Sequence, residues 1–254
     1  MKVYNSPIAL MKVKGSRIFL IPQGVESYSS RELGAVDASR LKEARPGDRV
    51  TIAGEEFTVL RTQLSDILAS LKRGPQIITI KDSAAIIARC GINSGSMVIE
   101  VGAGSGALTI SLVYAVAPGG KVHSYEENRK NFEIVQENLR MCGMDGLVEL
   151  SPERAPDGIK ETNADAFIAD VPEPWRLTEA ACKALVPGGM ACYYIPTMNQ
   201  LESAAKSLRD AGFRGVEAIE TIERGIEARE GAVRPKFEML GHTGYLVFGR
   251  WAPQ

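Results

Sequence analysis

The sequence lacks the cysteine patterns that mark disulfide frameworks and zinc sites. Its four cysteines, Cys90, Cys142, Cys182 and Cys192, are widely spaced and include no CxxC pair. A small domain held together by disulfides and a zinc module with paired ligands are both excluded. We expect four reduced thiols that pack in the core, because disulfides are rare in a reducing cytosol.

The chain also lacks any long hydrophobic segment. No run approaches the ~20 apolar residues that a membrane-spanning helix needs. The N-terminal stretch MKVYNSPIALMKVKGS has neither the apolar core nor the small-residue cleavage site of a secretory signal. The sequence therefore predicts a cytoplasmic protein without a membrane partner.

A net charge of either sign is absent as well. The sequence has 30 basic and 31 acidic residues, which gives a formal charge of -1. A protein that binds nucleic acid by charge alone is usually more basic, so any RNA contact must come from local patches. The length of 254 residues allows one large domain, or a small domain and a large one.

The turn and hydrophobic patterns change near residue 75 and divide the chain in two. Residues 1–74 contain short β-rich runs separated by glycines, which predict a small antiparallel sheet or barrel. These runs are IALMKV, RIFLIP, DRVTIAG and EEFTVLR. Residues 62–72 have a helical apolar period and predict a linker helix, which the Gly74-Pro75 pair ends.

From residue 75 to 254 the pattern alternates between helices and strands. Such alternation predicts a doubly wound, Rossmann-like α/β domain with a parallel sheet. The expected strands are MVIEVG, KVHSYE, LVELS, ADAFIADV, GMACYYIP, GVEAIETIE and HTGYLVFGRW. Because the last two follow one another without a helix, we expect an antiparallel hairpin at one edge of the sheet.

The clearest motif is MVIEVGAGSGALT at residues 97–109. An apolar strand leads through Glu100 to Gly102, Gly104 and Gly106, and a helix begins at once. Glycines let a backbone pass close under a bulky ligand and adopt positive φ. A tight turn without a ligand is the alternative, but the order of strand, glycines and helix favours a nucleotide-cofactor site.

An acidic residue at the tip of the next strand supports this interpretation. Glu126 lies 20 residues beyond Gly106 and can accept hydrogen bonds from both ribose hydroxyls of an adenosine ligand. NAD and S-adenosylmethionine both contain that ribose. The GxGxG spacing and Glu100 favour S-adenosylmethionine, whose cationic groups suit carboxylates better than a pyrophosphate would. Alone, Glu126 could also be a solvated neighbour of a helix N-cap.

A third motif, ADVPEPW at residues 169–175, ends a strand at Asp170. Ligands of doubly wound sheets bind at the carboxyl ends of the strands, so Asp170 is predicted to point into the cleft. Pro172 and Pro174 fix φ and stiffen the loop, which would hold an acceptor with little ordering cost. The alternative is a rigid β-to-α turn without a function.

Together these motifs resemble the transfer-RNA adenine-N1 methyltransferases that act at position 58, in their prokaryotic homo-oligomeric form. The resemblance covers nearly the whole chain, and HTGYL and IPTMNQ are its more family-specific segments. It implies a class I methyltransferase domain behind a β-rich module, with S-adenosylmethionine as methyl donor and tRNA as substrate. It also implies a homo-oligomer, with a tetramer favoured, whose contacts we expect at residues 216–223 and 242–250.

The resemblance also implies roles for individual residues. Asp170 would be the catalytic carboxylate, Glu126 would hold the ribose, and Gln76 with the Lys81-Asp82 turn would cover the cofactor. The expected cofactor-binding residues are Gln76, Glu100, Gly102, Gly104, Ser105, Gly106, Ala107, Leu108, Thr109, Glu126, Glu153, Arg154 and Asp170. Tyr194, His242 and Thr243 are expected at the acceptor base, where either Tyr194 or Trp175 could stack on it or be a core aromatic.

The sequence departs from the family pattern at two places. Thr79-Ile80 stands where the family commonly has Tyr-Pro or His-Pro before Lys-Asp. Arg154, with Glu153 beside it, stands at or next to the acidic residue that usually contacts the cofactor adenine. Either Glu153 or a backbone carbonyl could make that contact instead.

The implied reaction needs no base to remove a proton before attack. N1 of neutral adenine has a free lone pair, and its methylation leaves a cationic ring. A carboxylate beside the N6 amino group would stabilise that charge as it develops. Because N1 lies on the base-pairing edge, the enzyme must extract the nucleotide from its structure.

Basic residues outside the cleft are the candidates for RNA contacts, although each of them alone is more often a solvated surface charge. They are Lys12, Lys14, Arg17, Lys72, Arg73, Arg224, Arg229, Arg234 and Lys236. Alternative functions are a protein isoaspartyl or corrin-ring methyltransferase, which would not explain DVPEPW or HTGYL. A non-catalytic RNA-binding subunit should have lost the glycine loop or Asp170, and a nicotinamide oxidoreductase should have the GxGxxG spacing.

Overall fold

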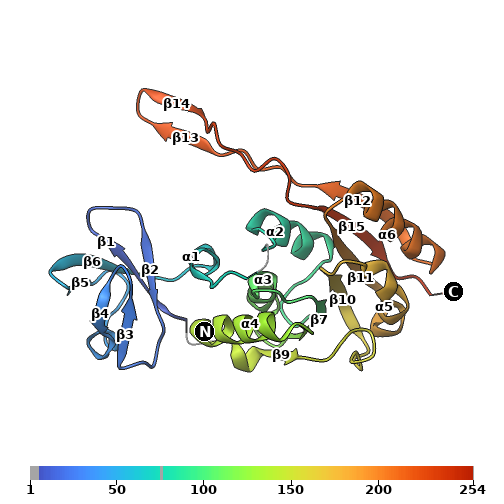
Figure 1. Cartoon of the computed structure of the whole chain (residues 1–254), viewed down its shortest axis with the longest axis horizontal. Coiled ribbons are helices and arrows are strands. Elements are labelled where there is room, and N and C mark those ends of the chain that lie inside the picture. Colours follow the sequence, from blue (N-terminus) through green and yellow to red (C-terminus); the bar gives the residue numbers. More distant parts are fainter. Residues whose placement is uncertain (1–5, 75–76, 254) are drawn as a thin grey trace.

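The computed structural model describes residues 6–74 and 77–253, which form a small β-rich part and a larger α/β part (Figure 1). The small part contains an antiparallel sheet in the order β2-β1-β6-β5, as predicted. Its strands are β1 (Ile8–Lys12), β2 (Ile18–Ile21), β5 (Arg49–Ile52) and β6 (Glu55–Leu60). Alternate side chains of these strands, among them Leu10, Ile21 and Phe57, form a core of their own.

A second strand pair in the small part was not predicted. It consists of β3 (Ser27–Ser30) and β4 (Gly34–Asp37), and the short 3-10 helix η1 (Ala38–Leu41) follows it. Its residues are mostly polar and exposed, so no apolar alternation marks these strands in the sequence.

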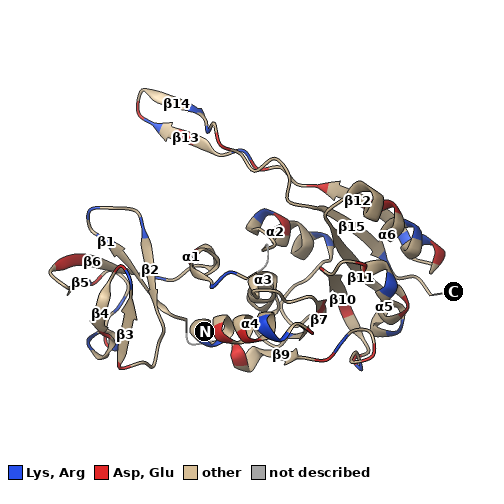
Figure 2. Ribbon diagram, viewed as in Figure 1, with Lys and Arg blue, Asp and Glu red and all other residues tan. Residues whose placement is uncertain are grey.

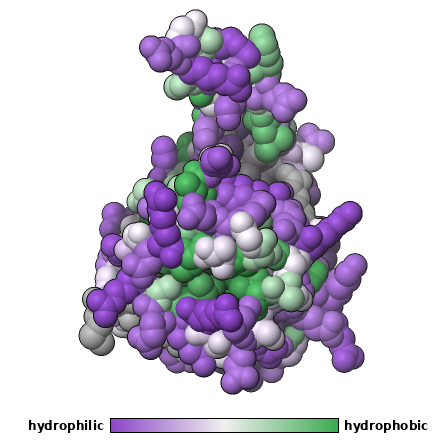
Figure 3. Space-filling model, turned by 90° about the vertical axis from the view of Figure 1, so that its left-hand side faces the viewer, coloured by the Kyte–Doolittle hydropathy of each residue, from purple (hydrophilic) through white to green (hydrophobic). Residues whose placement is uncertain are grey.

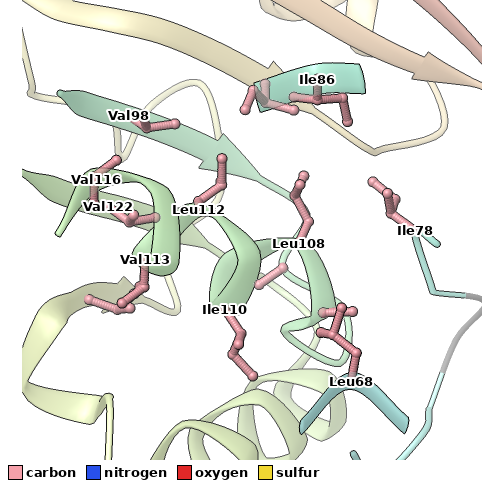
Figure 4. Packing of buried hydrophobic residues seen from close by; sticks show 14 of the residues in the cluster. Leu68, Ile78, Ile86, Val98, Leu108, Ile110, Leu112, Val113, Val116 and Val122 are labelled. Carbon is pink, nitrogen blue, oxygen red and sulfur yellow. The ribbon is translucent and has the colours of Figure 1, made fainter. Parts of the chain in front are cut away.

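One helix connects the two parts. The linker helix is confirmed as α1 (Leu64–Ser70), which begins with a capping box between Gln63 and Asp66. Its buried Ile67 and Leu68 belong to the same hydrophobic cluster as the core of the α/β part (Figure 4). The helix is therefore packed as part of the larger core rather than exposed as a tether.

A seven-stranded sheet in the order β12-β15-β11-β10-β7-β8-β9 forms the α/β part and confirms the Rossmann-like prediction. Strands β7 to β11 are parallel, and β15 is antiparallel to both its neighbours. The order reverses between β7 and β10, and the carboxyl ends of strands at such a point leave a crevice. The strands are β7 (Met97–Val101), β8 (Lys121–Tyr125), β9 (Val148–Ser151), β10 (Ala164–Ala169), β11 (Leu185–Ile195), β12 (Arg214–Glu220) and β15 (Tyr245–Arg250).

Helices cover both faces of this sheet and enclose two hydrophobic clusters. Residues of α2, α3 and α4 contribute to one cluster, and residues of α5 and α6 contribute to the other. The helices are α2 (Ile80–Arg89), α3 (Ala107–Val116), α4 (Arg129–Cys142), α5 (Thr178–Ala184) and α6 (Met198–Asp210), with 3-10 turns η2 (Asp145–Leu147) and η3 (Pro174–Leu177). Within the described residues, no helix has the length and hydrophobicity to span a bilayer. The four cysteines form no disulfide in the described structure; Cys90, Cys142 and Cys192 are buried in the core as expected, whereas Cys182 is half-buried.

The predicted C-terminal hairpin is present, but a long excursion interrupts it. Strands β12 and β15 pair antiparallel, and residues 221–244 between them form an arm that projects from the body (Figure 1). The arm contains the hairpin of β13 (Ile226–Arg229) and β14 (Ala232–Pro235). Since β15 lies between β11 and β12, residues 245–250 are not a free edge, so the oligomer contact expected at residues 242–250 has no open strand edge there.

A buried polar network attaches the base of the arm to α2. The fully buried carboxylate of Asp82 accepts hydrogen bonds from the hydroxyls of Thr79 and Thr243, both at 2.8 Å, and from Thr221. The Lys81 ammonium donates to Asp82 at 2.8 Å, to Thr243 at 2.6 Å and to Thr221 at 3.0 Å. Burial alone would raise the pKa of Asp82, but these donors hold it below its ordinary value.

Replacing Asp82 should therefore destabilise the fold. Asp82→Ala leaves the nearly buried Lys81 ammonium without its carboxylate, and we expect the free energy of unfolding to fall by about 3–5 kcal/mol. Because the folded pKa is lowered, this contribution is present at neutral pH and is lost as the pH falls through the folded pKa. Urea titration measures the effect. The exposed pair of Glu179 and Lys183 supplies the control, since Glu179→Ala should change stability by less than about 0.5 kcal/mol. An equal, small effect of both variants would contradict the prediction.

Candidate active site

A cavity of about 740 Å³ opens at the carboxyl ends of β7, β8, β9, β10 and β11. It lies at the reversal of strand order, and its volume is in the range of small-molecule sites, ~300–1,000 Å³. Five segments that follow these strands line it, together with Ile77 and Ile78 before α2. These segments are residues 101–105, 125–128, 153–156, 170–173 and 194–196, of which all but position 195 face the cavity.

The glycine loop after β7 forms the floor of the cavity. Gly102 has φ +92°, and a Cβ there would lie 2.1 Å from the backbone carbonyl oxygen of Asp170, so only glycine fits. The Asp170 amide in turn donates to the Val101 carbonyl at 2.9 Å. Gly104, with φ +58°, also lines the cavity. The loops after β7 and β10 are thereby held in contact.

Gly106 does not line the cavity, unlike the two other glycines of the motif. It caps the N-terminus of α3 with φ +83°, and a Cβ there would lie 2.7 Å from the Val135 side chain of α4. The third glycine therefore permits close packing of α4 rather than close approach of a ligand. Ala107 and Leu108 at the start of α3 do line the cavity.

Glu126 follows β8 and holds the glycine loop in place. One carboxylate oxygen accepts from the Gly104 amide at 2.8 Å, and the other accepts from the Asn128 amide at 2.9 Å. Each carboxylate oxygen can accept a further hydrogen bond, so the residue can still bind two ligand hydroxyls. Its position in the cavity wall is compatible with the predicted ribose contact.

The cavity contains negative charge without a matching cation. Burial, together with the nearby charge of Glu126, raises the pKa of Asp170 to about 7. The two arginines of the wall are already paired, Arg154 with Glu127 at 3.4 Å and Arg176 with Glu173 at 3.1 Å. No ion pair of the described residues involves Glu126 or Asp170, so a cationic ligand would relieve their mutual repulsion.

Ser105 supplies a polar atom that lacks a hydrogen-bond partner among the described residues. Its side chain is buried and lines the cavity, and its hydroxyl has no hydrogen bond within the described structure. Buried polar groups are normally hydrogen-bonded, so this hydroxyl is available to a ligand. A ligand with a positive charge and polar groups, as the predicted cofactor has, fits this cavity.

Glu100 and Thr109 lie behind the glycine loop and do not line the cavity, so the expected direct contact with a ligand is not observed. The Glu100 carboxylate is fully buried and accepts from Thr109 at 2.6 Å and from Ser124 at 2.5 Å. Burial raises the pKa of Glu100 to about 7. The residue thereby connects β7, β8 and α3 behind the glycine loop.

Tyr194 and Thr243, which are expected at the acceptor base, both line the cavity. The Tyr194 hydroxyl donates to the Thr243 carbonyl at 2.5 Å, and burial raises the pKa of Tyr194 to about 12, so the phenol stays neutral. The sequence interpretation missed Gly244, whose Cβ would lie 2.4 Å from the Tyr194 ring. A glycine directly before β15 is the signal that could have indicated this contact.

Other expected acceptor-side and cofactor residues lie elsewhere. His242 does not line the cavity, because its ring bonds Glu220 at 2.6 Å and the Pro196 carbonyl at 3.1 Å. Trp175 packs against the hydrophobic cluster of α5 and α6 rather than facing the cavity. The Lys81-Asp82 turn is engaged in the network at the arm base, and Gln76 lies outside the described residues.

Glu153 and Arg154 both line the cavity after β9. Arg154 is paired with Glu127 at 3.4 Å, and Glu153 is paired with Lys160 at the longer distance of 4.0 Å. Glu153 is therefore the less engaged of the two.

The candidate RNA-binding cations are distributed over the small part, the linker and the arm, and none of them lines the cavity. Figure 2 shows basic and acidic residues interspersed over both parts and the arm. The residues already ion-paired within the chain are Lys12, Arg17, Lys72, Arg229 and Arg234. No ion pair of the described chain involves Lys14, Arg73, Arg224 or Lys236, which lie in the small part, the linker and the arm.

Comparisons with known proteins are consistent with this geometry. The model of a family described as "tRNA methyltransferase complex GCD14 subunit" matches residues 67–234. The chain is 32% identical to the tRNA (adenine(57)-N(1)/adenine(58)-N(1))-methyltransferase TrmI of Methanocaldococcus jannaschii, over 96% of this chain and 95% of that protein.

Two solved structures resemble the whole chain, each at 28% identity. A SAM-dependent O-methyltransferase from Thermotoga maritima has a TM-score of 0.82, covering 98% of this chain and 94% of that one. The tRNA (m1A58) methyltransferase TrmI from Aquifex aeolicus has a TM-score of 0.75, covering 97% of each chain.

A side chain at Gly104 should block the cavity. Gly104→Val places a branched side chain in the loop, and we expect the affinity for S-adenosylhomocysteine to fall by at least about tenfold, ~1.4 kcal/mol. Gly91→Val is the matched control, because Gly91 has a similar φ of +65° with no atom within 4 Å of a Cβ and lies outside the cavity. Both variants carry the same backbone strain. Calorimetry that gives wild-type affinity for folded Gly104→Val would refute the assignment of this loop.

Proposed function

Since the chain belongs to the family of the tRNA methyltransferase complex GCD14 subunit, we propose that it transfers a methyl group from S-adenosylmethionine to N1 of adenine in tRNA, at position 58. Full-length similarity to named adenine-N1 methyltransferases favours this function over the isoaspartyl and corrin-ring alternatives. The observation that carries the proposal is the placement of Asp170 in a cleft with Glu126, Tyr194 and Thr243.

The residues of the cleft divide between the two substrates. Glu126 holds the ribose of the methyl donor, and the backbone of Gly102 and Gly104 lets its methionine part lie close. The Ser105 hydroxyl donates or accepts a hydrogen bond there. S-adenosylmethionine supplies the methyl group from a sulfonium, whose charge the carboxylates of Glu126 and Asp170 offset.

Asp170 acts on the acceptor adenine. Its carboxylate accepts a hydrogen bond from the N6 amino group and stabilises the positive charge that N1 gains with the methyl group. Tyr194, which is neutral and fixed by its bond to Thr243, provides a ring against which the extracted base stacks. No residue has to remove a proton before attack, because the N1 lone pair is free.

We expect unmodified tRNA and labelled S-adenosylmethionine to give labelled 1-methyladenosine. Since the methyl group lies on the base-pairing edge, it stops primer extension and so locates the modified position. A stop at adenine 58 fits the proposal, and a label at adenine 57 alone or on a ribose or base oxygen would contradict it.

Replacing Asp170 should separate catalysis from cofactor binding. We expect Asp170→Ala to reduce single-turnover methylation by roughly 10²–10³, with nearly unchanged affinity for S-adenosylhomocysteine. Asp170→Asn should retain more activity, because an amide oxygen still accepts from N6 but cannot offset the charge. Because the raised pKa of Asp170 leaves it partly protonated at neutral pH, wild-type kcat/KM should rise with pH, and Asp170→Asn should lose that dependence. Wild-type turnover of folded Asp170→Ala would remove this residue from the mechanism.

We also propose that the chain forms a homo-oligomer, a tetramer in the prediction, through the arm at 221–244. Of the nine large hydrophobic side chains exposed in the described residues, six lie on this arm. They are Ile222, Ile226, Val233, Phe237, Met239 and Leu240, and Phe237 is 88% exposed. Figure 3 shows apolar surface among polar residues on the projecting part at the top of the view. Exposed apolar surface of this extent on a projecting hairpin favours burial against a second copy. The cytoplasmic location stays a prediction.

Sedimentation tests the role of the arm. We expect the wild-type chain to sediment as an oligomer at micromolar concentration, and a double variant Phe237→Ser/Leu240→Ser to dissociate. Met198→Ser changes a residue that is 62% exposed on α6, and it should leave the assembly intact. A monomeric wild type, or equal assembly of both variants, would exclude the arm as the interface.

A further inference from the structure

Three potential metal ligands meet outside the cleft, where β8, β9 and the segment before β10 come together. His123 on β8 is the register partner of Glu149 on β9, and Glu161 lies just before β10. Nδ1 of His123 lies 3.0 Å from Oε2 of Glu149 and 3.1 Å from Oε1 of Glu161. One ligand atom from each residue falls within 4.8 Å of the others.

The imidazole does not make ordinary hydrogen bonds to these carboxylates. His123 is 7% exposed, and neither ring nitrogen has a hydrogen-bond partner of acceptable geometry within the described structure. An N–H donor to a carboxylate would lie near the line between the two heavy atoms. By contrast, two ligand atoms that each lie ~2.1 Å from one ion are about 3.0 Å apart in octahedral and about 3.4 Å apart in tetrahedral coordination, and the ion lies off the line between them. The observed spacing fits shared coordination.

The second oxygen of each carboxylate is held by a neighbour on β8. Lys121 donates to Oε1 of Glu149, and the Tyr125 hydroxyl donates to Oε2 of Glu161 at 2.5 Å. Partners of this kind orient metal ligands, and here they leave the remaining oxygen of each carboxylate directed at His123. The side chain of Glu149 is 52% exposed, so an ion and its water ligands can enter from solvent.

We propose that His123, Glu149 and Glu161 bind one divalent transition-metal ion of the Zn²⁺ type, with water completing its coordination. A neutral imidazole with two carboxylates suits Zn²⁺, Co²⁺ or Mn²⁺, whereas Ca²⁺ and Mg²⁺ take oxygen ligands. With the ion on Nδ1, the proton resides on Nε2. The site is independent of the methyl-transfer chemistry.

The position of the two carboxylates gives the ion a structural role. Glu149 and Glu161 bracket the segment that carries residues 153–156 of the cavity wall. An ion that joins both to His123 closes a loop around this segment and restricts its motion. Tyr125 makes a second connection, because it lines the cavity while its hydroxyl bonds Glu161.

Metal titration of chelator-treated full-length protein tests the proposal. We expect one Zn²⁺ or Co²⁺ to bind per chain, with a rise in Tm, and we expect Glu149→Gln and His123→Gln each to weaken binding by at least about tenfold. Co²⁺ absorption distinguishes this site from the cysteines, since only thiolate ligands give an intense near-ultraviolet charge-transfer band. Glu149→Gln is isosteric and half-exposed, and its Tm in chelator verifies folding.

The other histidine of the chain provides the control. His242 contacts Glu220 at the surface without a second carboxylate, so Glu220→Gln should bind metal as the wild type does. Absence of uptake by the wild-type protein, a thiolate band with Co²⁺, or undiminished binding by Glu149→Gln would each overturn the proposal. None of these measurements depends on methyltransferase activity.

Discussion

The close approach of Gly102 to the carbonyl of Asp170 determines the geometry of the cleft. Because Gly102 has no side chain, the loops after β7 and β10 touch, and the Asp170 amide bonds the end of β7. This contact brings the Asp170 carboxyl close enough to Glu126 for their charges to interact. Glu126 in turn fixes the same loop through the Gly104 amide. One stretch of backbone thus positions both carboxylates, and a cation between them would strengthen the arrangement.

Local signals were sufficient to predict the sheet and most of the cleft. Apolar runs indicated the strands, and Gly102, Glu126 and Asp170 each follow a strand, where topology brings them together. The same signals could not distinguish the role of Gly106 from the roles of Gly102 and Gly104, because the role of Gly106 depends on its close contact with Val135 of α4. Glu100 was predicted to contact the cofactor but lies outside the cavity, since its partners Thr109 and Ser124 come from two further elements.

The long-range polar contacts at the base of the arm could not be predicted from the sequence. Thr221 and Thr243 stand at the two ends of the arm and bind the same Lys81-Asp82 pair near the start of α2. Neither threonine lies in a recognisable motif with that pair, and periodicity reports only neighbours on one element. Thr243 also lines the cavity, so the base of the arm and the cleft share a residue.

Strand β15 occupies an internal position in the sheet although it is the last strand of the sheet in the chain. A ribosome delivers β12 before β15, so the open side of β11 has no neighbour while the arm is being synthesised. The backbone groups on that side stay unpaired until residues 245–250 arrive, and β12 cannot join the sheet before then. This half of the domain therefore completes its folding only after residues 245–250 have been synthesised. Until then, β11 is the edge where a chaperone or a neighbouring nascent chain would pair.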